Sequence, residues 1–287
     1  MSSGATEAEP PLAIAGRLRY VPGYTHGMRY PSLVATVAVR GEPGELPWLD
    51  DVDSRIVLTP VQGAVLAGPE VRDAQHPLLA ALLRVLDRVQ RATGVPVMAP
   101  GIVTGFEGVR ATVRIPVLRR QHAAVGALLK WTLELFRLLA SGLSTDGHVL
   151  LLRGVLDEFR SASFGANHPR FLRNAHSMGV PFLELPGAVM QYGQGARGRW
   201  FESSFTDRTS RIGTQFARNK MLAANMLRQA GIPASRQVLA GDAAAALRAA
   251  EAIGYPVVVK PLDTDGGVGV STGLRSAAAV ERAFALA

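Results

Sequence analysis

Two spacings of apolar residues alternate along the first half of the chain. Short alternating or β-branched runs predict strands at 17–21, 33–39, 55–57 and 109–117. Apolar residues three and four apart predict helices over 77–93 and 121–140, which end at Gly94 and at Ser141-Gly142. The first 160 residues are therefore expected to form an α+β domain.

Helices and short strands also alternate in the second half. The pattern predicts helices over 170–178, 210–230, 242–253 and 277–287, and strands over 182–185, 190–192, 256–259 and 268–272. Asp242 and Ser276 are predicted N-caps, and 141–162 is predicted to hold a linker with a strand and a helix. We expect a second domain over 161–287, incomplete at its C-terminal end because the last helix has no C-cap signal.

Composition excludes several kinds of protein. The chain is 48% hydrophobic and 19% charged, and it has no cysteine for a disulfide or a thiolate site. It shows neither a leader nor an apolar run that could span a bilayer, so we expect a cytoplasmic protein without a membrane partner. The net charge of +8 comes from dispersed arginines without interleaved aromatics, which does not favour nucleic-acid binding.

Lysine is rare in this chain, and the position of one lysine suggests that it binds phosphate. Only Lys130, Lys220 and Lys260 occur among 31 basic residues. Lys260 ends the predicted strand 256–259 and precedes glycines that let backbone amides approach an anion. A compact ammonium suits phosphate oxygens, although a solvated lysine before an ordinary hairpin turn gives the same pattern. The loop is neither a Walker motif nor a dinucleotide fingerprint.

A series of motifs extends this observation through the second half. The motifs lie at 178–182, 192–199, 203–212, 219–220, 227–233 and 253–263. The last reads Ile-Gly-Tyr-Pro-Val-Val-Val-Lys-Pro-Leu-Asp. Their order resembles the start of an ATP-grasp ligase of the cyanophycin synthetase family over about 160–287, whereas 1–159 resembles that family's N-terminal domain only loosely.

This resemblance implies a fold and an activity. The fold class is α/β, with an α+β N-terminal domain (1–160) that helps to hold polymer and the first part of an ATP-grasp domain (161–287). The family phosphorylates a carboxylate with ATP and lets an amine attack the acyl phosphate, building a polymer of aspartate and arginine. The implied partners are ATP with Mg²⁺, an amino acid and a peptide or polymer substrate, and homo-oligomerisation is left open.

The resemblance also assigns site residues. Lys220 and Lys260 would contact ATP phosphates, and the loop with Gly266, Gly267 and Gly269 would close over them. Candidate substrate contacts are Arg197, Arg199, Ser203 and Ser204. No residue is assigned to catalysis or to a metal, because the family's magnesium ligands are expected beyond residue 287. The fragment alone is therefore expected to be inactive.

One departure leaves the substrate open. The family's loop carries Asn-His-Gly-Arg-Gly, whereas residues 265–269 read Asp-Gly-Gly-Val-Gly. The alternatives are another ATP-grasp amino-acid or peptide ligase, similar to glutathione synthetase, and a non-catalytic module that binds anions. The six histidines show no metal-ligand spacing, which favours structural roles for them.

Overall fold

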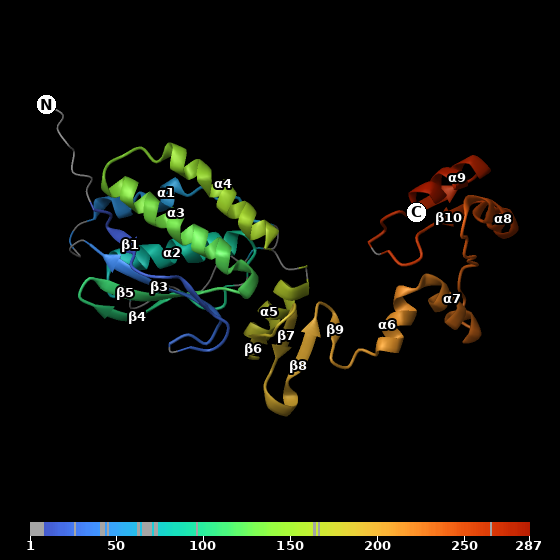
Figure 1. Ribbon diagram of the computed structural model, residues 1–287, viewed down its shortest axis with the longest axis horizontal. Helices are drawn as coiled ribbons and strands as arrows, with labels where there is room; N and C mark the ends of the chain where they lie inside the picture. The colour runs from blue at the N-terminus through green and yellow to red at the C-terminus, as the bar shows by residue number, and fades with distance from the viewer. Residues whose placement is uncertain are drawn as a thin grey trace. The chain divides into compact units, whose positions relative to one another are not determined.

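The computed structural model describes residues 9–287 except 26, 41–43, 45, 62–63, 65–70, 72–73, 96, 163–164, 166 and 265. The chain forms two compact units, Met1–Asp207 (the N-terminal unit) and Arg208–Ala287 (the C-terminal unit), which are drawn in Figure 1 and described one at a time.

A five-stranded antiparallel sheet organises the first part of the N-terminal unit. Its strands are β1 (Leu12–Ile14), β2 (Arg19–Val21), β3 (Ser32–Val39), β4 (Ile102–Glu107) and β5 (Arg110–Pro116). The order is β1-β3-β5-β4, and β2 also pairs with β3. Leu33 opposes Ile115 and Val37 opposes Ala111, so one face of the sheet is apolar and buried.

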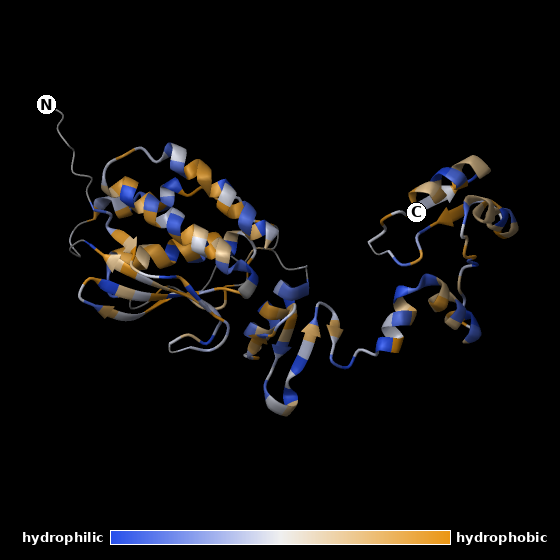
Figure 2. Ribbon diagram, viewed as in Figure 1, coloured by the Kyte–Doolittle hydropathy of each residue, from blue (hydrophilic) through white to orange (hydrophobic). Residues whose placement is uncertain are grey.

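Helices cover that buried face (Figure 1). They are α1 (Val52–Arg55), α2 (Pro77–Ala92), α3 (His122–Ala140) and α4 (Asp146–Ser161), with the 3₁₀ turns η1 (Pro47–Leu49) and η2 (Arg119–Gln121). Figure 2 shows apolar and polar bands along these helices, and this amphipathic pattern is the one from which α2 and α3 were predicted. Leu82, Leu128 and Phe136 are fully buried in the core. The predictions for α2 and α3 are confirmed.

Two predictions in this part were wrong. Residues 55–57 form no strand: Arg55 is the last residue of α1, and Val57 is 81% exposed. Residues 141–162 contain one helix, α4, without the predicted strand. Leu152, Val155 and Phe159 are its buried residues, and their spacing of three and four is helical. At 55–57 the two apolar residues Ile56 and Val57 were too short a signal to specify a strand.

A second sheet completes the N-terminal unit. The helix α5 (Asn167–Ser177) precedes β6 (Phe182–Glu184), β7 (Val189–Tyr192), the turn η3 (Gly195–Arg197), β8 (Arg199–Glu202) and β9 (Phe205–Thr206). The four strands form an antiparallel sheet in chain order. Leu172 and Phe182 pack with Met98 and Leu118, which connects this sheet to the first one. The domain boundary expected between residues 160 and 161 stays a prediction.

The C-terminal unit is a hairpin with helices beside it. Its elements are α6 (Arg211–Arg218), α7 (Lys220–Gln229), α8 (Ala243–Ile253), β10 (Val257–Val259), β11 (Ser271–Leu274) and α9 (Ala277–Leu286). Ala246 and Ala250 of α8 pack against Val257 and Val280. The predicted caps are confirmed: Asp242 Oδ1 accepts from Ala245 N at 2.6 Å and Ser276 Oγ accepts from Ala279 N at 3.4 Å.

The helix predicted over 210–230 is two helices. Asn219 separates α6 from α7 with extended backbone angles, φ −94° and ψ 107°. Its Oδ1 accepts from Met221 N and Leu222 N, each at 3.0 Å, and so caps the second helix. The strand predicted over 268–272 also begins later, at Ser271, because the preceding glycines have positive φ.

The fold class is α/β, as expected, with mixed helices and sheets whose described strand pairs are antiparallel. Across the described ranges, no helix is long and apolar enough to cross a membrane.

Candidate functional site

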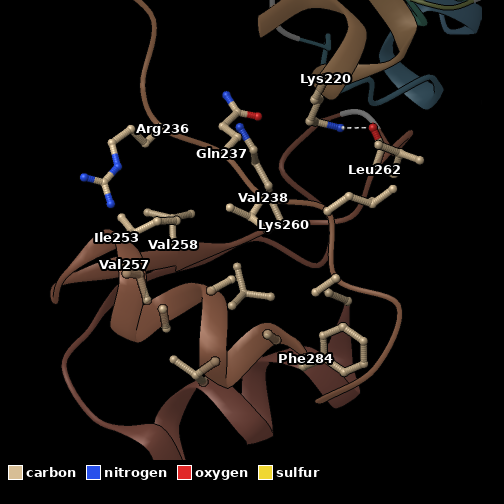
Figure 3. A pocket seen from close by; sticks show the side chains of 18 of the residues that line it. Lys220, Arg236, Gln237, Val238, Ile253, Val257, Val258, Lys260, Leu262 and Phe284 are labelled. Atoms are coloured by element: carbon tan, nitrogen blue, oxygen red, sulfur yellow. Dashed lines mark hydrogen bonds between the residues drawn. The ribbon is translucent and has the colours of Figure 1, made fainter. Parts of the chain in front are cut away.

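A cavity of about 830 Å³ opens in the C-terminal unit. It lies between the segment 235–240, the strand β10 with the residues after it, and the helices α8 and α9 (Figure 3). Apolar side chains make most of its wall, notably Val238, Ile253, Val257 and Phe284. Its size and apolar character are typical of a small-molecule pocket.

The polar side of this cavity is cationic. Lys220, Arg236 and Lys260 line it, and none of the described lining residues has a carboxylate side chain. The unit has ten basic and five acidic residues, a net charge of +5. An anion in this cavity would therefore meet positive charge without a competing acidic side chain.

Lys260 is held at the cavity by the strand before it. Val257 is buried in the core of the unit, which fixes β10, and Lys260 directly follows Val259 at the end of this strand. Lys260 is exposed, and its ammonium has no hydrogen-bond or ion-pair partner within the described part of the chain. An exposed ammonium without a partner can bind an anion without first breaking another contact.

Lys220 is the first residue of α7 and is already hydrogen-bonded. Its Nζ donates to the carbonyl oxygen of Thr264 at 2.7 Å and to that of Leu262 at 3.4 Å (Figure 3 draws the second bond). Asn219 caps the next two amides, and Ala223 N donates to Asn219 O. The backbone amides at this end of the helix already donate hydrogen bonds. An anion could therefore interact here only with the lysine side chain and with the helix dipole.

The glycine-rich loop lies beside Lys220 and does not line the cavity. Gly266, Gly267 and Gly269 have φ of 67°, 80° and 73°, a backbone that favours glycine. A Cβ on Gly269 would lie 2.7 Å from Pro261 Cγ. None of the three glycines is among the residues that line the cavity. The structure therefore brings Lys220 and Lys260 to one cavity without these glycines.

Sequence reasoning missed Arg236 and the apolar wall. Arg236 Nη2 donates to the carbonyl oxygen of Ala252 in the last turn of α8, so this guanidinium is already engaged. The segment 235–240 was assigned to no element, and its Val238 and Leu239 were given no role. Two adjacent apolar residues between two helices were the only available signal.

The four candidate substrate residues lie in the N-terminal unit, around β8. Arg199 Nη1 donates to Gly198 O at 2.7 Å, and Ser203 Oγ accepts from Asn167 Nδ2 at 3.2 Å. Ser203 has φ 54° in the turn between β8 and β9. Arg197 and Ser204 are exposed. Their substrate role stays a prediction.

The histidines in the described residues have structural contacts. His168 Nε2 lies 3.1 Å from Ala188 O, and His148 Nε2 lies 2.8 Å from Trp131 O. His26 lies outside the described residues. Within the described ranges no three His, Asp or Glu side chains gather as a metal site would require.

The residues that line this cavity fall in a segment that is similar to known proteins. Residues 219–287 match the family model for the carbamoyl-phosphate synthase L chain, ATP binding domain, an ATP-grasp domain. The chain is also similar to cyanophycin synthetases. Those of Trichormus variabilis and Nostoc sp. are each 28% identical over 135 residues, 46% of this chain. That of Geminocystis herdmanii is 29% identical over 131 residues, 44% of this chain. The matched part spans 15% of the length of each relative.

Proposed function

We propose that this chain is the ATP-binding part of an ATP-dependent carboxylate–amine ligase that resembles cyanophycin synthetase. One observation carries the proposal: the segment that matches an ATP-binding domain holds an apolar cavity lined by both Lys220 and Lys260, and Lys260 has no partner among the described residues. A base needs an apolar wall and a triphosphate needs cations, and this cavity offers both.

The residues of the cavity fit a nucleotide. The adenine would lie against Val238, Ile253 and Phe284, and Lys260 would bind phosphate oxygens as a point charge. Lys220 would bind a second phosphate oxygen after leaving Thr264 O. Gly266, Gly267 and Gly269 would cover the phosphates in a closed loop. ATP would enter as its magnesium complex, and no metal ligand is assigned to this chain.

In the longer protein, these cations would serve phosphoryl transfer. ATP supplies the phosphoryl group that activates a carboxylate, and an amine then displaces phosphate to form an amide. Lys220 and Lys260 would position the phosphates and stabilise the charge that develops on their oxygens. Arg197, Arg199, Ser203 and Ser204 would contact the acceptor. The family resemblance implies that the product is a polymer of aspartate and arginine.

Calorimetry of ATP binding to the 287-residue chain tests the phosphate role. Lys260→Ala should weaken ATP binding about tenfold or more, because a charge-assisted hydrogen bond contributes roughly 1.5–3 kcal/mol. Lys130→Ala is the matched control, since Lys130 is an exposed lysine of α3 in the other unit and should leave the affinity unchanged. An unchanged affinity in Lys260→Ala would remove the role assigned to this lysine.

Tripolyphosphate separates a nucleotide site from a simple anion-binding module. If the apolar wall binds adenine, ATP should bind more tightly than tripolyphosphate, and Val238→Asn, which adds polarity without charge, should reduce only the preference for ATP. Equal affinity for both ligands would favour the anion-binding alternative. The ligase itself is tested in the longer protein, which should release phosphate from ATP only when an aspartate-type or peptide acceptor is present.

A further inference from the structure

The cationic side chains that line the cavity of the C-terminal unit lie at two separate ends. Lys220 and Lys260 line the end where β10 finishes, whereas Arg236 lies at the opposite end, beside Ile253 (Figure 3). A strand rises ~3.3 Å per residue, so the step from Val257 to Lys260 separates these ends by roughly 10 Å. A single ligand that contacts both ends must therefore be elongated.

A hydrogen bond fixes the guanidinium of Arg236. Its Nη2 donates to the carbonyl oxygen of Ala252, in the last turn of α8. The last carbonyl groups of a helix carry partial negative charge, which offsets part of the positive charge of the arginine. Arg236 is therefore less favourable for phosphate than Lys260, whose ammonium has no partner among the described residues.

The flat faces of this guanidinium remain available. Arg236 is exposed, and no carboxylate of the described part of the chain pairs with it. A hydrogen bond from Nη2 lies in the plane of the guanidinium, so it leaves both faces of the plane free for stacking. The contact with Ala252 thus orients the plane without covering it.

Apolar side chains extend the same end of the cavity. Val238 is two residues after Arg236, Ile253 directly follows Ala252, and both apolar residues line the cavity. Val238 is 57% exposed, so its side chain is available to a ligand. A planar cation beside branched apolar side chains matches the face of an aromatic heterocycle, because the ring attracts the cation and packs against the methyl groups.

We propose that Arg236 determines the base specificity of the site: its guanidinium stacks on a purine while Lys220 and Lys260 bind the phosphates. This inference rests on the proposed function, and it adds the direction in which the nucleotide lies and the residue that selects the base. Larger ring systems are the better partners of a stacked cation, so the two fused rings of a purine bind more tightly here than the single ring of a pyrimidine.

ATP and UTP test this role by calorimetry on the 287-residue chain, because they carry the same triphosphate and differ in the base. ATP should bind about three- to tenfold more tightly than UTP. Arg236→Ala should reduce this ratio about threefold or more, and tripolyphosphate affinity should stay within about twofold, since the two ends lie about one Debye length apart. Equal affinity for ATP and UTP in the unchanged chain overturns the proposal.

Two further variants separate the plane of the guanidinium from its charge. Arg236→Lys keeps the charge without the plane, so the ratio of ATP to UTP affinity should fall in this variant too. Arg248→Ala is the matched control, because Arg248 is an exposed arginine of α8 that does not line the cavity, and it should leave the ratio unchanged. Far-UV circular dichroism checks that each variant is folded. A full ratio in Arg236→Lys contradicts the stacking contact, and so does an equal loss of ATP, UTP and tripolyphosphate affinity in Arg236→Ala.

Stacking also has a spectroscopic signature. The ring current of a stacked purine should shift the NMR resonance of the Arg236 Nε–H upfield when ATP binds, and tripolyphosphate should not produce this shift. A resonance that stays in place when the chain is saturated with ATP overturns the proposal, whatever the variants show.

Failure of this inference is distinguishable from failure of the proposed function. If Lys260→Ala weakens the binding of ATP and UTP alike while Arg236→Ala leaves their ratio unchanged, the nucleotide site stands and the role of Arg236 is lost. If neither nucleotide binds in a way that depends on Lys260, the proposed function fails, and this inference fails with it.

Discussion

At the residue scale, the positions of the rare lysines are the part of the candidate site that could be predicted from the sequence. Lys260 was picked out because 28 of the 31 basic residues are arginine and because it precedes a glycine-rich loop, and the family resemblance added Lys220; both line the same cavity. The difference in hydrogen bonding between these two lysines could not be predicted. Lys220 is hydrogen-bonded to two carbonyls, whereas Lys260 has no partner in the part of the chain that the structure describes, and this difference depends on how the loop after Pro261 folds back on α7.

Lys260→Arg tests whether the point charge itself is needed. The charge is retained, but the planar fork and the longer reach of arginine differ from the geometry of an ammonium, so ATP affinity should fall about tenfold. Calorimetry measures the fall against Lys130→Arg, which should bind as before. Full affinity in Lys260→Arg would mean that the site requires only a positive charge.

Tyr192 offers a prediction about pH. Burial raises its pKa from 10.0 to about 12, and its buried hydroxyl has no hydrogen-bond partner among the described residues. The raised pKa means that the folded chain favours the neutral phenol. This contribution to stability is fully present below pH 10 and is lost as pH rises from 10 towards 12.

Tyr192→Phe should therefore reduce the loss of stability between pH 10 and 12. Near pH 7 it should be neutral or slightly stabilising, by up to about 1 kcal/mol, because it removes an unpaired buried hydroxyl. Urea unfolding at pH 7 and at pH 11, followed by near-UV circular dichroism, gives both numbers. A loss of more than about 2 kcal/mol at pH 7 would show that the hydroxyl has a partner after all.

At the element scale, the break at Asn219 is the clearest failure of periodicity. Apolar residues continue at helical spacing from Ile212 to Leu227, so the pattern gives no sign of an interruption. Asn219 is nevertheless a good N-cap, and its two hydrogen bonds start a new helix at Lys220. A cap residue inside an apolar repeat is a competing signal, and here the cap decided the structure.

Asn219→Ala should destabilise the start of α7 by about 1 kcal/mol, because two amides lose their acceptor. Asn219→Asp is the matched control, since its carboxylate can accept the same hydrogen bonds. Urea unfolding followed by far-UV circular dichroism measures the change. If both variants are as stable as the unchanged chain, α6 and α7 form one helix as the periodicity predicted.

The glycine-rich loop gives a prediction with two controls. Gly269→Ala should destabilise the C-terminal unit by about 1–3 kcal/mol, because it combines a positive φ with a Cβ 2.7 Å from Pro261 Cγ. Gly267→Ala has the positive φ and open space, so it should cost less. Gly241→Ala has neither feature and should be neutral. Thermal unfolding of the three variants should give that order.

At the scale of the whole molecule, elements were easier to predict than their partners. The helices α2, α3, α8 and α9 follow from local spacing and caps, and all four were expected. The contacts of Leu172 and Phe182 with Met98 and Leu118 join segments far apart in the chain. No local pattern encodes such contacts, so the packing of 167–206 on the first sheet was not foreseen.

Because Lys220 donates a hydrogen bond to Thr264 O, its contribution to ATP affinity is the difference between its contact with phosphate and its contact with Thr264 O. A phosphate can bind Lys220 only when Lys220 Nζ breaks its hydrogen bond to Thr264 O, whereas Lys260 can bind phosphate without breaking such a bond. Lys220→Ala should thus weaken ATP binding less than Lys260→Ala does, and it should speed amide exchange in 262–270 even without ATP. By thermodynamic reciprocity, a change that weakens the hydrogen bond between Lys220 and the loop should raise the affinity of Lys220 for phosphate. The carbonyl oxygens of the loop therefore compete with the nucleotide for Lys220.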